Sequence, residues 1–310
     1  MILYKTNDNW FGDMRHLFTS YTIRRIINAV IGIGIYAGLL IFAVNYWDLH
    51  PYLAMDTTMF SILGLILGLF LSFRTNTAYD RWWEARKQWG ALVNHSRNMA
   101  IYVDSMWSES DVGIRRFMAK HIANFCLGLT WHLRDGLDKH MDQLIYLAPE
   151  EKGYYETKAH IPNFIALRIF QRMSEAHRNG DINLGDYINI KAQHQALLDI
   201  LGACERIKKT PIPFSYNVYL KLFITAYGLL LPLGLLESFG YTAVPLTMLT
   251  FFALLGIELM GEEIEDPFGL DCNDLPTGDI AHTIKGNVFE ILEDRKPVES
   301  DRKELYEKVF

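Results

Sequence analysis

The chain has 310 residues, half of them hydrophobic, and a formal net charge of -6. The slight acidity argues against nucleic acid as a partner, because phosphate binding needs a basic surface. The apolar residues gather toward the two ends and leave a charged stretch between them. This distribution predicts an integral membrane protein with a large water-soluble part.

Four segments are apolar enough to cross about 30 Å of hydrocarbon as helices. They are Ile26–Tyr46, Leu53–Phe73, Tyr219–Leu236 and Val244–Met260. Lys and Arg flank the start of the first segment, the end of the second and the start of the third, and the links 47–52 and 237–242 contain neither. Because positive residues stay in the cytoplasm, we expect a multi-pass protein of the cell membrane with both termini cytoplasmic.

The stretch between the second and third segments is expected to be helical, since apolar residues recur at helical spacing around 114–125 and 192–207. Gly153 and Pro162 indicate loops within it. Cys126, Cys204 and Cys272 match no metal-binding spacing and are predicted to be reduced, buried thiols. The fold class is therefore all-α. The expected parts are a cytoplasmic segment at 1–25, transmembrane helices at 26–73, a cytoplasmic helical domain at 74–213, transmembrane helices at 214–261 and a cytoplasmic segment at 262–310.

The second apolar segment has two unlike faces. Ile62, Ile66 and Phe70 recur every four residues and form one bulky apolar stripe. Gly64 and Gly68 lie on the opposite face, where a small-xxx-small pair lets another helix approach closely. A ring of bulky apolar side chains can form a hydrophobic constriction in a channel. The pattern by itself fits contact with lipid or a neighbouring helix better than a pore lining.

A charged and aromatic run follows this segment directly, from Phe73 to Arg86. It predicts an anchor at the membrane interface that continues as an amphipathic helix, with an ion-pair network among Asp80, Arg81, Glu84 and Arg86. The residues expected to have this structural role are Arg74, Asn76, Tyr79, Arg81, Trp82, Glu84 and Arg86.

Carboxylates are dense after the fourth apolar segment. Such a cluster repels itself unless it binds a cation or pairs with basic residues such as those at 74–87. Oxygen ligands suit Ca²⁺ or Mg²⁺, although the spacing is not that of a calcium-binding helix-loop-helix. The candidate cation-binding residues are Glu262, Glu265, Asp266, Asp271 and Asp274.

Signals of enzyme chemistry are weak, since the sequence contains no phosphate-binding loop, nucleophile elbow or zinc-protease pair. The ten histidines are scattered, and His121 and His132 fall on different faces of one predicted helix. We therefore expect no catalytic residues and no cofactor. The identity of any metal stays open.

Together these features resemble the bestrophin family of ion channels, in its bacterial branch. The resemblance covers nearly the whole chain and rests on the Phe-Arg-x-Asn-x-Ala-Tyr-x-Arg-Trp-Trp-Glu-x-Arg run at Phe73–Arg86 and on Glu-Asp-Pro-Phe-Gly at Glu265–Gly269. It implies a homopentamer in a lipid bilayer, in bacteria the inner membrane, with four spans per subunit and one central pore.

The family's hydrophobic neck, carried over to this sequence, falls on Ile62, Ile66 and Phe70. Counting back from Arg81 instead favours Leu65, Leu69 and Phe73. The family also narrows the cytoplasmic exit with an apolar side chain, for which the matching position is Ile182, in a polar turn.

Ion preference is also inferred from the resemblance. Animal members carry a continuous acidic run after Pro-Phe-Gly that binds calcium, whereas this chain has fewer acids there, so we expect no calcium activation. The resemblance to bacterial members implies a channel for monovalent cations. The acidic balance of the chain also favours cations such as sodium. The alternatives are a chloride or other anion channel, a membrane enzyme that uses the acidic cluster, and a carrier, for which no repeat between halves is visible.

Overall fold

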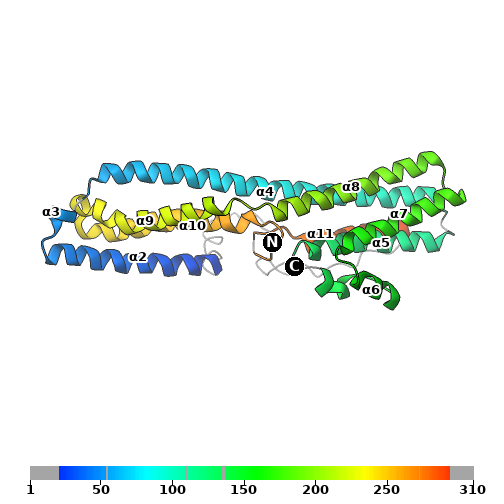
Figure 1. Ribbon diagram of the computed structural model, residues 1–310, viewed down its shortest axis with the longest axis horizontal. Helices are drawn as coiled ribbons and strands as arrows, with labels where there is room; N and C mark the ends of the chain where they lie inside the picture. The colour runs from blue at the N-terminus through cyan, green and yellow to red at the C-terminus, as the bar shows by residue number, and fades with distance from the viewer. Residues whose placement is uncertain (1–20, 54, 109, 135–136, 272, 294–310) are drawn as a thin grey trace, which may run out of the picture. The chain divides into compact units, whose positions relative to one another are not determined.

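The computed structural model describes residues 21–293 except 54, 109, 135–136 and 272 (Figure 1). Expectations for residues 1–20, Cys272 and residues 294–310 lie outside this range. The described residues form helices and no strand, so the all-α fold class is confirmed. The α-helices are α2 (Tyr21–Tyr46), α3 (His50–Leu53), α4 (Thr57–Met106), α5 (Val112–His132), α6 (Pro149–Glu156), α7 (Ile161–Asn179), α8 (Leu184–Lys209), α9 (Phe214–Phe239), α10 (Ala243–Glu265) and α11 (Thr277–Glu293). Two short 3₁₀ helices are η1 (Leu137–Gln143) and η2 (Gly240–Thr242).

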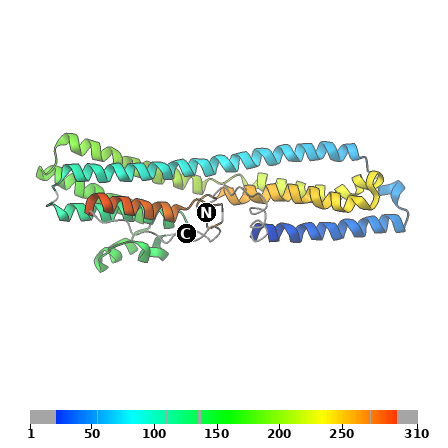
Figure 2. The same cartoon turned by 180° about the vertical axis from the view of Figure 1, so that it is seen from behind.

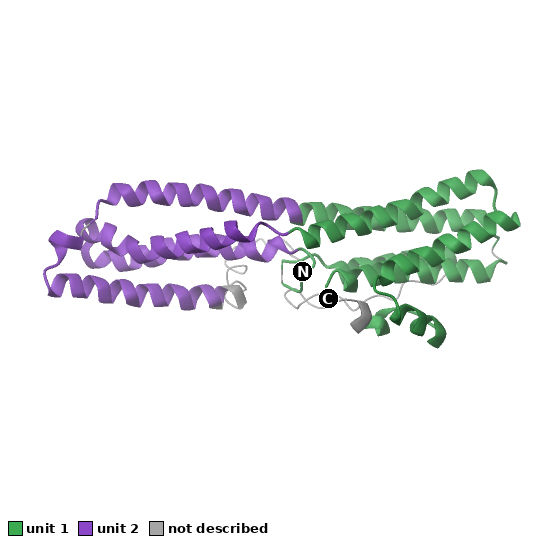
Figure 3. Ribbon diagram, in the orientation of Figure 1, with its two compact units in different colours: residues 1–3, 82–210, 267–310 green, residues 4–81, 211–266 purple. Residues whose placement is uncertain are grey.

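The chain divides into two compact units (Figure 3). Unit 1 comprises residues 1–3, 82–210 and 267–310, and unit 2 comprises residues 4–81 and 211–266. The division falls inside α4, so this helix contributes to both units. The predicted apolar segment ends at Phe73, and the helical continuation expected of the Phe73–Arg86 run is confirmed. No Gly or Pro interrupts the chain between Phe73 and Gly90, and the helix extends beyond the run to Met106.

Unit 2 is built from long apolar helices. α10 packs against both α2 and α9, and α2 also contacts α9. Three helical stretches have the length and composition to cross a membrane, namely Arg25–Tyr46, Thr57–Met106 and Phe214–Glu265. The last stretch reverses at η2, where Gly240 has a φ of 49°, so that α9 and α10 lie side by side (Figures 1 and 2).

The Gly234 position on α9 is filled by the ring of Phe60. A Cβ added to Gly234 would lie 2.1 Å from Phe60 Cδ2, and Phe60 is 5% exposed. We therefore expect Gly234→Ala to destabilise unit 2 by about 1–3 kcal/mol, the usual cost of overpacking. Thermal unfolding of the purified protein in detergent measures the effect. Gly32→Ala is the matched control, since a Cβ there meets no atom within 4 Å, and an equal effect of both changes would contradict the assignment.

Unit 1 has a core of its own, centred on α5. This helix is buried along most of its length and contacts α7 and α11 (Figures 1 and 2). Trp89, Met118, Phe125 and Ile169 are each fully buried in this core. The helical prediction for the segment is confirmed, but Gly153 lies inside α6 and Pro162 in the first turn of α7. Proline is accommodated there because first-turn N–H groups have no intrahelical partner.

The two cysteines within the described range are reduced and buried, as predicted. Burial raises the pKa of both Cys126 and Cys204 to about 12. Because the thiolate is the reactive form, these side chains act as small core residues.

His121 makes the stability of unit 1 dependent on pH. Burial lowers its pKa from 6.5 to about 4, while its Nδ1 lies 2.8 Å from the carbonyl oxygen of Phe117. Below pH 6.5 His121 binds a proton in the unfolded chain but stays neutral in the folded chain. The free energy of unfolding therefore decreases as the pH falls toward 4. At pH 5 the expected loss is about 2 kcal/mol, from 1.36 kcal/mol per pKa unit.

Chemical denaturation between pH 7 and pH 5 checks this expectation. His121→Leu removes the titrating group and should flatten the pH dependence. His194 is also buried with a lowered pKa, so a smaller slope should remain. Parallel profiles for the wild type and His121→Leu would contradict the assignment.

Candidate functional site: an exposed stripe and a buried charged cluster

One face of α4 packs within unit 2. Phe60, Leu67 and Leu71 are buried against α9, where they meet Leu220, Ile224 and Tyr227. The Tyr227 hydroxyl donates a hydrogen bond to the Phe60 carbonyl at 3.1 Å. A hydroxyl bound to a helix carbonyl fixes the distance between the two helices.

The predicted neck stripe of Ile62, Ile66 and Phe70 is only partly covered by its own chain. Ile62 is 56% exposed and Ile66 is 39% exposed, whereas Phe70 is half-buried and packs against the α4–α9 core. The alternative stripe of Leu65, Leu69 and Phe73 is more open, with exposures of 76%, 55% and 55%. Both stripes therefore offer bulky apolar surface, and each stays a prediction for the pore.

The two glycines of α4 differ in their surroundings. A Cβ on Gly64 would lie 2.7 Å from the Tyr227 hydroxyl oxygen, which agrees with the predicted close approach of a helix. A Cβ on Gly68 would meet no atom within 4 Å. Close packing within the chain therefore uses Gly64.

Arg74 is the centre of a buried charged cluster. Its side chain is 1% exposed, and its Nη2 lies 3.6 Å from Glu258 Oε1 and 3.3 Å from Glu265 Oε2. Its Nε donates to Asn217 Oδ1 at 3.2 Å. Gly261 makes room for the guanidinium, since a Cβ there would lie 2.4 Å from Arg74 Nη1.

Lys221 extends the same cluster, with its Nζ 3.0 Å from Glu262 Oε1 and 3.9 Å from Glu258 Oε1. Glu265 also accepts the Ile212 N–H at 3.0 Å. Two of the carboxylates proposed as cation ligands, Glu262 and Glu265, are thus paired with basic side chains. This pairing is the alternative to cation binding that the sequence left open.

The other three acidic candidates lie at the end of α10 and in the turn that follows it. Asp266 is exposed at the end of α10. Asp274 is buried, and its carboxylate accepts the Asp271 N–H at 2.6 Å, which closes the local turn. Within the described part of the chain, these five acids form no group of three or more side chains close enough to share a metal ion. Cation binding by them stays a prediction.

Three further residues of the Phe73–Arg86 run contact residues far along the chain. Arg81 donates from Nε to the Glu265 carbonyl at 3.1 Å, and Trp82 donates from Nε1 to the Asn273 carbonyl at 3.0 Å. Glu84 pairs with Arg206 of α8 at 2.7 Å, so the predicted pairing within the run is replaced there by a partner far along the chain. Asn76, Tyr79 and Arg86 are exposed.

Ile182 lies between α7 and α8 and is 4% exposed, as part of the unit 1 core. Its burial leaves little of the side chain available to narrow a pore, and a constriction at this position stays a prediction. The sequence analysis did not predict one group of side chains, which consists of His132, His160 and Glu205. These residues are at least 28 positions apart in the sequence and come together only in the folded chain.

Comparisons with known proteins identify relatives over most of the chain. The family model described as "Bacterial/Fungal Bestrophin protein" matches residues 1–290. A protein of Nostoc sp. named voltage-dependent anion channel-forming protein is 36% identical over 74% of this chain and 76% of its own length. A protein of Mesorhizobium japonicum with the same name is 31% identical over 89% of this chain and 87% of its own length.

Solved structures show the same fold. A bacterial bestrophin homolog from Klebsiella pneumoniae superposes with a TM-score of 0.80 at 25% identity, covering 86% of this chain and 98% of the other. A structure described as a membrane protein reaches a TM-score of 0.82 at 23% identity, covering 88% of this chain and 100% of the other. The chain therefore belongs to the bestrophin family in its bacterial and fungal branch, a family of ion channels rather than enzymes.

Proposed function

We propose that this chain forms a homopentameric channel for monovalent ions in the bacterial inner membrane. Each subunit contributes four spans, with α9 and α10 as the third and fourth, and both termini lie in the cytoplasm. The proposal places segments 26–73 and 214–261 in the membrane. It places segments 1–25, 74–213 and 262–310 in the cytoplasm. The exposed apolar face of α4 supports this proposal. The opposite face of the same helix is packed on α9, so the exposed face is available to line a pore.

The pore neck in this proposal is formed by Ile62, Ile66 and Phe70 from each subunit. A ring of apolar side chains resists ion passage because the ion must lose hydrating water to cross it. Such a ring can also gate the pore by dewetting. Side chains that line a pore must be uncovered within their own subunit. Ile62 and Ile66 meet this requirement.

Anions are the proposed permeant ions. The relatives from Nostoc and Mesorhizobium are both named as anion channel-forming proteins. The cation preference expected from the acidic balance finds no support in these comparisons. An apolar neck carries no charge of its own, so the sign of the ion must be measured.

Reconstitution of the purified protein into planar bilayers tests the proposal. Under a tenfold KCl gradient, an anion-selective pore reverses near the chloride equilibrium potential, about 59 mV in magnitude for a monovalent ion. A reversal of the opposite sign would establish a cation channel. The absence of any current across several preparations would reject the channel assignment.

The same bilayers test the expectation that calcium does not activate the channel. Asp274 already uses its carboxylate within its own turn, which agrees with a segment that needs no bound ion. Currents should stay the same when a calcium chelator replaces micromolar calcium. A loss of current on chelation would contradict the expectation.

A further inference from the structure

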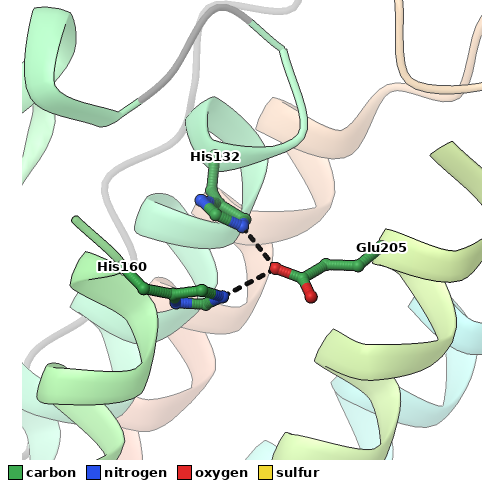
Figure 4. Close-up of side chains that lie close together, drawn as sticks. All are labelled: His132, His160 and Glu205. Carbon is green, nitrogen blue, oxygen red and sulfur yellow. Dashed lines mark hydrogen bonds and ion pairs between the residues drawn. The ribbon is translucent and has the colours of Figure 1, made fainter. Parts of the chain in front are cut away.

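Three side chains from separate helices meet within unit 1 (Figure 4). His132 is the last residue of α5, His160 precedes the first turn of α7, and Glu205 lies near the end of α8. The Nε2 atoms of His132 and His160 lie 2.6 Å and 2.7 Å from the same Glu205 oxygen, Oε1. The two imidazole rings are tilted with their centres 4.5 Å apart, so both nitrogens point inward at one place.

We propose that His132, His160 and Glu205 bind a divalent transition-metal ion, with Zn²⁺ as the preferred ion. Two imidazole nitrogens and one carboxylate oxygen form a three-ligand zinc set that leaves the fourth position to water. All three ligand atoms lie within 4.8 Å of one another. The side chains are 20–29% exposed, so an ion can enter from solvent without the core opening.

The site needs a small adjustment to accept the ion. Ligands at about 2.0–2.2 Å from a tetrahedral zinc are roughly 3.3 Å apart, which is wider than the present contacts to Glu205 Oε1. Glu205 has a flexible side chain at the rim of the unit, so a rotation separates the atoms without moving a helix. Each neutral imidazole then carries its proton on Nδ1 rather than Nε2.

Two neighbouring groups oppose the ion weakly. The Asn163 N–H donates to His160 Nδ1 at 3.4 Å, a long contact that is given up when Nδ1 holds the proton. Lys209 lies 3.7 Å from Glu205 Oε2 but is 72% exposed, so solvent screens its charge.

The ion would join α5, α7 and α8 at one point. Without it, the same three side chains hold together through two hydrogen bonds to one carboxylate oxygen. These two states make different predictions for added metal. A metal site binds one ion per chain and raises the melting temperature, whereas a hydrogen-bonded trio does neither.

The test uses the full-length, tag-free protein in detergent, treated with a chelator and then titrated with ZnCl₂ by calorimetry. We expect one zinc per chain in the wild type. His132→Ala and Glu205→Gln should each weaken binding by at least about 100-fold, beyond the 10–100-fold typical of outer-shell partners. The control is His95→Ala, which removes a histidine bonded to Gln193 and should leave zinc binding unchanged.

Two further measurements keep the test decisive if the ligand variants fail to fold. Lys209→Ala, an exposed change, should tighten zinc binding up to about fivefold, the equivalent of a surface ion pair. Cobalt in place of zinc should give the strong visible bands of four- or five-fold coordination. No stoichiometric zinc in the wild type, equal binding in the ligand variants, or a weak six-coordinate cobalt spectrum would each overturn the proposal.

Discussion

Replacing Arg74 with Met is expected to lower the melting temperature of the protein strongly or to abolish its assembly. Glu258 is 1% exposed and lies 3.6 Å from the Arg74 Nη2, with Glu265 at 3.3 Å. Removing one partner of a buried ion pair leaves an uncompensated charge and costs about 3–5 kcal/mol. Lys221 remains near Glu258 at 3.9 Å, but this amine is half exposed and compensates incompletely.

Thermal unfolding and size-exclusion chromatography in detergent measure this effect. Arg172→Met is the matched control, since Arg172 forms an exposed pair with Glu175 that is worth about 0–1 kcal/mol. The double variant Arg74→Met/Glu258→Gln should recover part of the loss, because the buried charge then disappears with its partner. Wild-type behaviour of Arg74→Met would show that the charged cluster is not needed.

Replacing Ile66 with Ser is expected to raise the single-channel conductance. Under the proposed function, Ile66 forms a ring of apolar side chains from which ions must shed water. A hydroxyl ring that lowers this barrier by about 1.4 kcal/mol raises the rate of passage roughly tenfold. Ile66 is 39% exposed, so a serine there is compatible with the fold of the subunit.

Leu65→Ser is the paired variant, because Leu65 belongs to the alternative stripe and is 76% exposed. Single-channel recording of both variants in the same bilayers decides the register. If Ile66 forms the neck, Leu65→Ser conducts like the wild type. A change in Leu65→Ser alone would move the neck to Leu65, Leu69 and Phe73, and unchanged currents in both would remove α4 from the pore.

The sequence predicted the helical character of this chain well because hydropathy and helical spacing are local signals. The apolar stretches coincide with α2, α4, α9 and α10. The continuation of this helix through the Phe73–Arg86 run was predicted from its helical spacing, but its extension to Met106 was not. No Gly or Pro interrupts the chain between Phe73 and Gly90, and α4 passes through Gly90 without a break.

Contacts between distant segments were harder to predict. Pairing of the acidic residues with Arg74 was one of two readings, since a carboxylate cluster has the same sequence pattern whether it holds a cation or an arginine. The meeting of His132, His160 and Glu205 has no local signal, because each lies at or near a helix end. Ile182 was predicted from the family resemblance to narrow the cytoplasmic exit, yet the residue is buried in the unit 1 core.

The position of α11 has a consequence for how the protein is made. α11 packs on α5 in unit 1, yet α9 and α10 lie between these two helices in the sequence. The ribosome therefore finishes α9 and α10 before it supplies the last helix of the unit 1 core. During that interval the apolar face of α5 that later meets α11 is bare, and nascent chains are exposed to aggregation until synthesis passes Glu293.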